Sequence, residues 1–502
     1  MRRIGRLTLA CLAILLPGYA THNCSGQEWS PSGLDASRIE QESRGLGSDS
    51  QSTPDTPSQE PSSSDSGAQN ELPEQRTAPR SVHEYGPPGH VRRRQDRGAS
   101  TPALQSQSFS VPPEDKQFHG SFPGSVKIPG TSTSLRIGGF VRGQGIFDFN
   151  PIDAQDDFDT TKIPVPQQAG QNATFTARAT RIEIESHTDS ACLGDVKTYL
   201  EMDFFESKTQ TDFASYRLRS RKLYLDVGWF RFGQDASVFT DYDSYPSLID
   251  YEMMGSKLLL RNALVRMTIP VREHVKIAVS AEQPFTDMSV PVDLAGNPVG
   301  DTEQDVPDFA THLRYDSHWG HIQLGGVIRE LGFRPTGSAV LTDTGYGGAI
   351  SGDFHPWARL RCELPSGECV SPLAKCRVVG EFVSGYGISR YLADPHEADV
   401  DAGLTSAGEL EALFTRGWYL GYEHWWRPCW MSTIAYGENA NSGTDTLPGS
   451  TYAGSKYAGV NLKWVPTKKF WLGVEYLWGQ RQDLDRQAAR ARRLQFGAQY
   501  NF

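Results

Sequence analysis

The sequence predicts an all-β fold: a transmembrane antiparallel β-barrel of about 16 strands, preceded by a disordered N-terminal arm. The chain of 502 residues has a mean hydropathy of -0.48, yet it contains 49 Gly, 19 Tyr, 11 Trp and 23 Phe. Long segments of its C-terminal part alternate apolar and polar residues, and short and long connections alternate between them. Barrel strands turn every second side chain to lipid and the others to water, so their average hydropathy stays polar.

The composition excludes several other classes of protein. After the first residues there is no run of about 20 apolar residues, the length that a helical membrane span requires. A net charge of -11 and a pI near 5.6 argue against a nucleic-acid partner, which favours a basic surface. We find no nucleophile elbow, no metal-ligand cluster and no glycine-rich phosphate loop. We therefore expect neither enzymatic activity nor a metal or cofactor.

The N-terminal part has two predicted segments before the barrel. Residues 1–20 resemble a signal peptide, because an arginine-rich start precedes an apolar run that is too short to span a bilayer. Residues 21–130 are rich in Ser, Pro, Gln and charge, a composition that cannot bury enough apolar surface to fold. We expect a disordered periplasmic arm there, and residues 131–502 form the predicted outer-membrane barrel. The basic residues Arg92–Arg94 are either solvated or contact an anionic partner such as the cell wall.

The two ends of the predicted barrel show the clearest alternation. Residues 134–149 place apolar side chains at one parity and charged side chains at the other, over a length that exceeds an ordinary soluble strand. Residues 493–502 alternate throughout and end on Phe502, which lies on the apolar face. A terminal aromatic residue that closes an alternating strand resembles the C-terminal signature of bacterial outer-membrane proteins. The alternative is a chance edge strand in a soluble β-domain.

The connections predict the number of strands. Short turns fall near 189–194, 228–229, 270–273, 316–320, 356–375, 427–428 and 466–469. Longer polar loops fall near 150–173, 207–215, 235–256, 285–308, 333–345, 387–415, 439–453 and 482–489. An even strand number, with short turns at one end and long loops at the other, is typical of outer-membrane barrels. About 16 strands enclose an aqueous lumen, so a pore follows from the strand number.

Several segments, taken in order, resemble the DcaP-like trimeric porins. They are LRIGGFVRGQGIFDFN (135–150), GQDASVFTDYDSYPSLIDYEMMGS (233–256), LRNALVRMT (260–268) and YGISRYL (386–392). The resemblance spans most of residues 134–502. It implies a homotrimer in the outer membrane, one pore per subunit narrowed by an inward-folded third loop, and passive uptake of small organic anions such as dicarboxylates. Two features depart from the family: the arm is Pro- and Ser-rich where a coiled coil is common, and the turn at 356–375 is enlarged.

Strand parity and the third loop give the candidate pore residues. The basic candidates are Arg136, Arg142, Arg181, Arg217, Arg219 and Arg261, and the acidic ones are Asp235, Asp241, Asp243, Asp250 and Glu252. Rows of opposite charge across a constriction orient dipolar solutes and set ion preference. The alternative is that these charges pair and brace the loop. Arg221 and Lys222 require either a bulge or the strand end if both face the lumen. Of Arg261 and Arg266 we expect Arg261 inside.

Five cysteines map to predicted turns or turn edges, and hence to the oxidising periplasm. They are Cys192 and the four disulfide candidates Cys362, Cys369, Cys376 and Cys429. Their spacing is unlike that of structural zinc ligands, so we expect disulfides, whose connectivity the sequence leaves open.

The sequence supports three hypotheses of function from different classes. The first is a porin for passive diffusion of small hydrophilic solutes, with outer-membrane lipid and two further copies of the chain as partners. The second is a structural barrel that the arm tethers to the cell wall. The third is a secreted soluble β-protein that binds glycans.

Overall fold

The computed structural model describes residues 119–154, 156–205, 216–364 and 367–502. All of them belong to one compact unit, residues 111–502. The predicted signal peptide and most of the predicted arm lie outside the described residues, and so does any contact of the arm with the cell wall. Residues 119–130, which we assigned to the arm, contain β1 (Val126–Lys127), which pairs with the start of β2.

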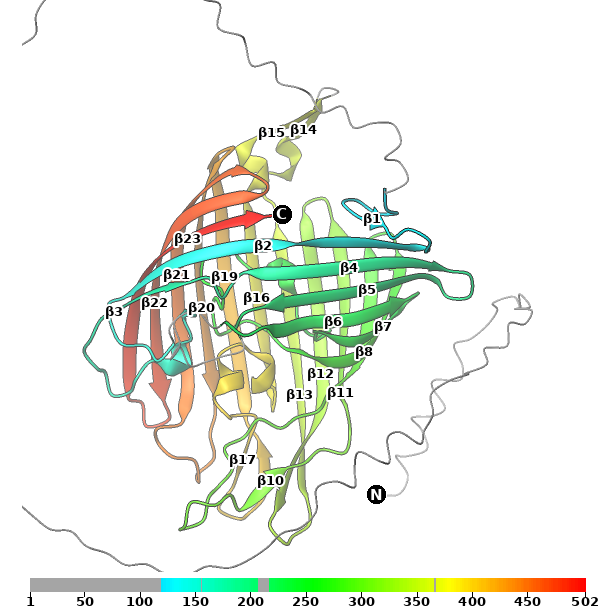
Figure 1. Cartoon of the computed structure of the whole chain (residues 1–502). Coiled ribbons are helices and arrows are strands. Elements are labelled where there is room, and N and C mark those ends of the chain that lie inside the picture. Colours follow the sequence, from blue (N-terminus) through cyan, green and yellow to red (C-terminus); the bar gives the residue numbers. More distant parts are fainter. Residues whose placement is uncertain (1–118, 155, 206–215, 365–366) are drawn as a thin grey trace, which may run out of the picture. The chain divides into compact units, whose positions relative to one another are not determined.

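Within the described residues, 16 strand positions form a closed antiparallel barrel (Figure 1). It closes where β2 pairs with β23, from Phe140 opposite Asn501 to Asp148 opposite Arg493. The barrel strands are β2 (Thr133–Asp148), β3 (Asn172–Thr176) continued by β4 (Arg181–Ser190), β5 (Gly194–Asp203), β6 (Arg219–Val227), β7 (Phe230–Ala236), β8 (Arg261–Arg272), β9 (Val275–Glu282), β11 (Asp308–Ser317), β12 (Gly320–Pro335), β13 (Leu341–Phe354), β16 (Arg377–Tyr386), β19 (Phe414–Arg427), β20 (Trp430–Asn441), β21 (Tyr452–Thr467), β22 (Phe470–Asp483) and β23 (Ala488–Asn501). The predicted fold class is confirmed.

Short elements lie in the connections. They are strands β10 (Gly300–Thr302), β14 (Arg361–Leu364), β15 (Gly367–Val370), β17 (Ala402–Leu404) and β18 (Leu410–Ala412), with the 3-10 turns η2 (Thr160–Lys162), η3 (Tyr242–Ser244), η4 (Ala358–Leu360), η5 (Pro372–Lys375), η6 (Ser389–Tyr391) and η7 (Pro395–Glu397). Among the described residues, no helix has the length and hydropathy that a membrane span requires.

Turns and loops separate to opposite ends of the barrel, as predicted. The hairpin β14–β15 extends the enlarged turn at one end, whereas β10 and β17 lie with the loops at the other (Figure 1). Gly194 (φ 73°) and Gly228 (φ 58°) occupy tight turns, where a positive φ costs glycine little. One predicted loop is shorter than expected, because β12 ends at Pro335 and β13 begins at Leu341.

The wall has the predicted two faces. On the outside, Leu420, Ile434 and Phe496 are exposed, while their neighbours on the same strands point inward and are buried. The inside is polar and charged, as a water-filled barrel requires. Of the two alternatives for Arg221 and Lys222, the structure has the bulge: the register between β5 and β6 shifts at Glu201 and Met202, so both side chains reach inward to carboxylates.

Candidate pore constriction

The third loop, residues 237–260, lies inside the barrel and is held by carboxylates of the wall. Glu475 on β22 is 1% exposed and accepts the backbone N–H groups of Ile249 at 2.7 Å and Asp250 at 2.6 Å. Such charge-assisted hydrogen bonds are strong, and they satisfy loop amides that no strand pairs with. The arrangement recurs where Glu423 accepts the Ser247 N–H at 2.8 Å and Glu381 accepts the Leu258 N–H at 2.7 Å.

Inward-facing glycines form the wall beneath this loop. A β-carbon at Gly473 would lie 2.8 Å from Ile249 Cδ1, and one at Gly497 would lie 2.9 Å from Ile249 Cγ2. A β-carbon at Gly421 would lie equally close, 2.9 Å, to Pro246 Cβ. Real β-carbons essentially never approach so closely, so the loop lies against the wall because these side chains are missing.

Asp241 fixes the first part of the loop to β12 and β13. It is 3% exposed and accepts a hydrogen bond from the Ser351 hydroxyl at 2.6 Å. His321 Nε2 lies 2.8 Å from its carboxylate, and the other ring nitrogen of His321 lies 2.6 Å from Asp353. Arg314 approaches Asp241 at 3.3 Å. A buried carboxylate with this many partners is an anchor, since removing one partner leaves a buried charge unpaired.

Arginines on the facing wall pair with carboxylates of β5. Arg221 contacts Glu201 at 2.7 Å and Asp203 at 2.9 Å. Arg219 donates to both carboxylate oxygens of Asp203, from Nε at 3.0 Å and from Nη2 at 2.8 Å, and Arg181 lies 3.3 Å from Glu201. Wall carboxylates therefore neutralise much of the positive charge of the predicted basic pore residues.

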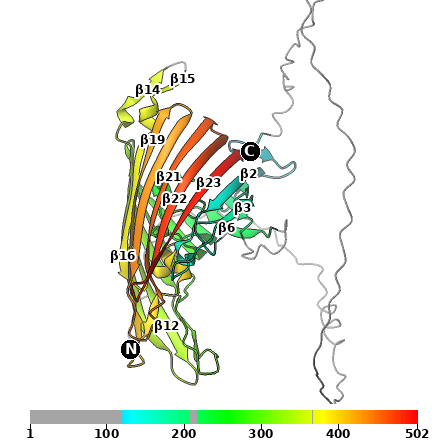
Figure 2. The same cartoon turned by 90° about the vertical axis from the view of Figure 1, so that its left-hand side faces the viewer.

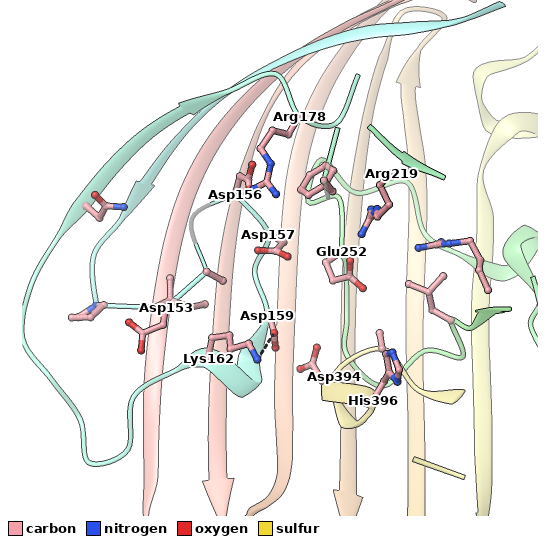
Figure 3. Close-up of a pocket in the computed structure, with 18 of the residues that line it drawn as sticks. Asp153, Asp156, Asp157, Asp159, Lys162, Arg178, Arg219, Glu252, Asp394 and His396 are labelled. Carbon is pink, nitrogen blue, oxygen red and sulfur yellow. Dashed lines mark hydrogen bonds and ion pairs between the residues drawn. The ribbon is translucent and has the colours of Figure 1, made fainter. Parts of the chain in front are cut away.

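A cavity of about 650 Å³ opens on the loop side of the third loop (Figure 3). Its walls come from the first loop (residues 149–171), the third loop and the sixth loop (residues 387–413). The charged residues that line it are Asp153, Asp156, Asp157, Asp159, Glu252 and Asp394, with Lys162, Arg178, Arg219, Arg261 and His396. We call this the outer cavity.

The outer cavity is less negative than its carboxylates suggest. Asp156 forms an ion pair with Arg178 at 2.8 Å. Burial raises the pKa of Asp157 to about 7, and repulsion from Glu252 and Asp156 adds to this shift. Burial also raises the pKa of Asp394 well above its usual range. Near neutral pH, several of these carboxyl groups are therefore paired or protonated.

A second cavity, of about 410 Å³, lies at the turn side of the third loop and is lined by Tyr242, Arg314, His321 and Asp353, among others. We call it the inner cavity. Arg261, which lines the outer cavity, donates a hydrogen bond to the Tyr242 hydroxyl at 3.3 Å. Arg261 therefore lies where the loop separates the two cavities. It forms no ion pair with any residue that the structure describes.

The other predicted basic residues have different environments. Arg142 faces inward, is 7% exposed and donates to the Ile249 carbonyl, with its guanidinium 5.2 Å from the Trp471 ring. Arg136 forms an ion pair with Glu185. Arg217 is exposed in the segment before β6 and lines neither cavity.

The predicted acidic residues also lie in different environments. Asp235 lies on β7 rather than on the loop, and it pairs with Arg266 at 3.3 Å and Lys222 at 3.6 Å. Arg266 is thus inside the barrel as well as Arg261. Asp243 lines the inner cavity, Glu252 lines the outer cavity, and Asp250 accepts the Tyr457 hydroxyl at 2.9 Å.

Two groups of residues escaped the sequence analysis. The acidic residues of the first loop lie in the segment DAQDDFDT (153–160), whose density of Asp was a usable signal. The anchoring residues Glu381, Glu423 and Glu475 are single inward glutamates on separate strands. Nothing in the sequence distinguishes them from other lumen residues.

The four candidate cysteines lie in two different settings. Cys376 is buried, accepts the Trp425 N–H at 3.2 Å and is a free thiol, as is Cys429. The pairing of β14 with β15 places Cys362 opposite Cys369. Disulfide formation by Cys362 and Cys369 stays a prediction, with the connectivity left open. Among the residues that the structure describes, no group of three or more His, Cys, Asp or Glu side chains is arranged to hold a metal ion.

The fold was compared with known proteins. No curated protein matches the chain. The outer membrane channel DcaP of Acinetobacter baumannii is similar in structure, with a TM-score of 0.60 and 22% identity over 74% of this chain and 98% of that chain, which shows a shared fold. An anion-selective porin from Comamonas acidovorans (TM-score 0.45, 10% identity, 74% of this chain and 100% of that chain) and the trimer form of OmpT of Vibrio cholerae (0.43, 9%, 74% and 100%) are too distant to add to this.

The family assignment rests on the sequence match. The model of the porin subfamily matches residues 124–499, which is most of the chain and all of the barrel except the last two residues of β23. The resemblance to the DcaP-like porins is confirmed by this match and by the shared fold. The chain belongs to the porin subfamily and is an outer-membrane channel rather than an enzyme.

Proposed function

We propose that this porin lets small hydrophilic solutes diffuse passively and prefers small organic anions such as dicarboxylates. The observation that carries the proposal is Arg261, a cation without a carboxylate partner among the described residues, at the point where the third loop divides the lumen. A charge at a constriction sets ion preference, because a solute passes it at close range and with little water between them.

The neighbouring charges support this choice of Arg261. Arg219 and Arg221 are held by Asp203, and Arg314 is held by Asp241 and Asp243, so they contribute little free positive charge. The outer cavity carries more acids than bases, but paired and protonated carboxyl groups reduce its negative charge. We expect the net field at the constriction to favour anions.

Assembly as a homotrimer in outer-membrane lipid is part of the same proposal. It rests on the family resemblance. If it is correct, each subunit provides its own lumen and conductance rises in groups of three steps.

The test is conductance of the refolded full chain in a planar bilayer under a salt gradient. We expect stepwise insertions in threes and an anion-selective reversal potential. Replacing Arg261 by glutamine (R261Q) should lower the anion-to-cation permeability ratio several-fold, while R217Q, which removes a charge outside both cavities, should leave it unchanged. A cation-selective wild type would move the filter to the acidic outer cavity, and a folded but silent protein would refute diffusion.

A further inference from the structure

The outer surface of β19 to β23 carries a group of exposed cations above an apolar groove. These strands are neighbours in the wall seen in Figure 2. The cations are Arg416, Lys456, Arg490 and Arg492, which we call the basic row. Each is exposed between buried neighbours on its own strand, so all four point away from the lumen.

The strand register brings three members of the basic row together. Lys456 lies opposite Gln480, and Gln480 lies opposite Arg490 on the next strand. Arg492 is the next outward residue after Arg490 and lies opposite Trp478. Neighbouring strands are about 4.8 Å apart, so an anion of a few ångströms reaches two or three of these side chains.

The positive charge of the row is largely uncompensated. Lys456 pairs with Glu438 at 3.4 Å. The Nε groups of Arg490 and Arg492 meet only neutral oxygens, of Gln480 at 3.2 Å and Asn150 at 3.3 Å. Arg416 has no ion-pair partner among the described residues. Four cations thus face one carboxylate, on a chain whose net charge is -11.

The row lies at the membrane surface on the loop side. On β21 the outward residues run from Trp464, at the turn end, to Lys456, a separation of roughly 27 Å at about 3.4 Å per residue. In a strand tilted by about 35–45° this stretch rises roughly 19–22 Å, and the long side chain of Lys456 extends it to about the ~25 Å height of the apolar band. Lys456 and its neighbours therefore lie at the level of lipid headgroups in the outer leaflet.

An apolar groove of about 500 Å³ lies below the row on the same outer face. Gly143, Gly145 and Ala498 line its base, because they are neighbours on β2 and β23 with small side chains. Phe175, Phe496 and Leu472 line its sides, and Phe175 is 84% exposed. On β23, only Leu494 separates Arg492 from Phe496 at the outward positions.

We propose that the basic row and this groove bind one phosphate-bearing lipid of the outer leaflet. The phosphate is held by Arg490, Arg492 and Lys456, and an acyl chain lies in the groove. Arginine suits this role, because its planar guanidinium donates two parallel hydrogen bonds to a phosphate.

The experiment measures lipid binding by native mass spectrometry of the delipidated full chain in maltoside micelles. The probes are phosphatidic acid and phosphatidylcholine with the same acyl chains. We expect phosphatidic acid to bind at least about tenfold more tightly, and the variant R416Q/K456Q/R490Q/R492Q to lose this preference. The control K127Q/R272Q/K468Q/K469Q removes four exposed charges near the turns and should retain it. Equal binding of both lipids by the wild type, or an unchanged preference in the basic-row variant, would overturn the proposal.

The groove is tested separately with A498L, which narrows it without changing charge. We expect weaker phosphatidic acid binding and an unchanged subunit number. Loss of the oligomer with unchanged lipid binding would show that a second copy of the chain occupies the groove, which contradicts the proposal. Displacement of the lipid by inorganic phosphate would show that the groove contributes nothing, and would contradict it as well.

Discussion

Replacing Glu475 by alanine should release the middle of the third loop from the wall. Glu475 accepts the N–H groups of Ile249 and Asp250, and hydrogen bonds to a charged acceptor contribute about 1.5–3 kcal/mol each. Losing both removes about 3–6 kcal/mol before relaxation. Lumen water can replace part of the lost hydrogen bonding, and the amide groups of Asn461 and Gln495, which also donate to Glu475, lose their acceptor. We therefore take about 2 kcal/mol as the net loss of free energy that attaches the loop to the wall. That shifts the balance between attached and released loop about 30-fold toward the released form.

The assay is single-channel conductance, combined with liposome swelling in sugars of increasing size. Glu475→Ala should raise conductance and admit larger sugars, because the loop no longer narrows the lumen. Glu330→Ala is the matched control: Glu330 lies on β12 opposite Thr344 and accepts the Asp305 N–H at 3.4 Å, so its removal leaves the contacts of the third loop unchanged. Heat-modifiable gel mobility checks folding. If the folded Glu475→Ala channel keeps the wild-type conductance and size limit, the carboxylate does not hold the loop and the reasoning is wrong.

Two further predictions concern the same region. Asp157, with a pKa near 7, is neutral below that pH and negative above it, so the anion preference should fall as the pH rises from 5.5 to 8.5. In D157N this fall should shrink to the part that His396 contributes. If the reversal potential of D157N changes with pH as much as that of the wild type, the prediction is wrong. Gly473→Val should displace Ile249 and raise conductance, whereas Gly348→Val on the outer face, where a β-carbon meets nothing closer than 3.8 Å, should not.

The fold was predictable because each strand repeats one physical requirement. Alternation of apolar and polar residues is local, so it can be read without knowing which strands are neighbours. The terminal Phe502 and the short turns are also local features that can be recognised without knowing which strands are neighbours. The exception at residues 333–345 has a clear cause, since β12 and β13 continue above the membrane as a paired hairpin whose residues no longer alternate.

The site was less predictable, because it depends on contacts between distant strands. Parity indicated that Arg219 faces the lumen, but it did not reveal that Asp203 neutralises it. Strict parity also favoured only one of Arg261 and Arg266, whereas both lie inside: Arg266 by its position in β8, and Arg261 because the strand begins there and its side chain turns toward Tyr242.

Selectivity in such a channel follows from the charges that remain after the wall has paired its own. A count of lumen residues overestimates the free positive charge of the lumen, since Arg219, Arg221 and Arg314 each hold a carboxylate within 2.9 Å. The same count overestimates the negative charge of the outer cavity, because several of its carboxyl groups are paired or protonated. Arg261 is a single residue, but no described carboxylate offsets its charge, and it lies between the outer cavity, which it lines, and Tyr242, which lines the inner cavity. The arrangement therefore makes one unpaired guanidinium, rather than the sum of the lumen charges, the expected determinant of which ions this porin conducts.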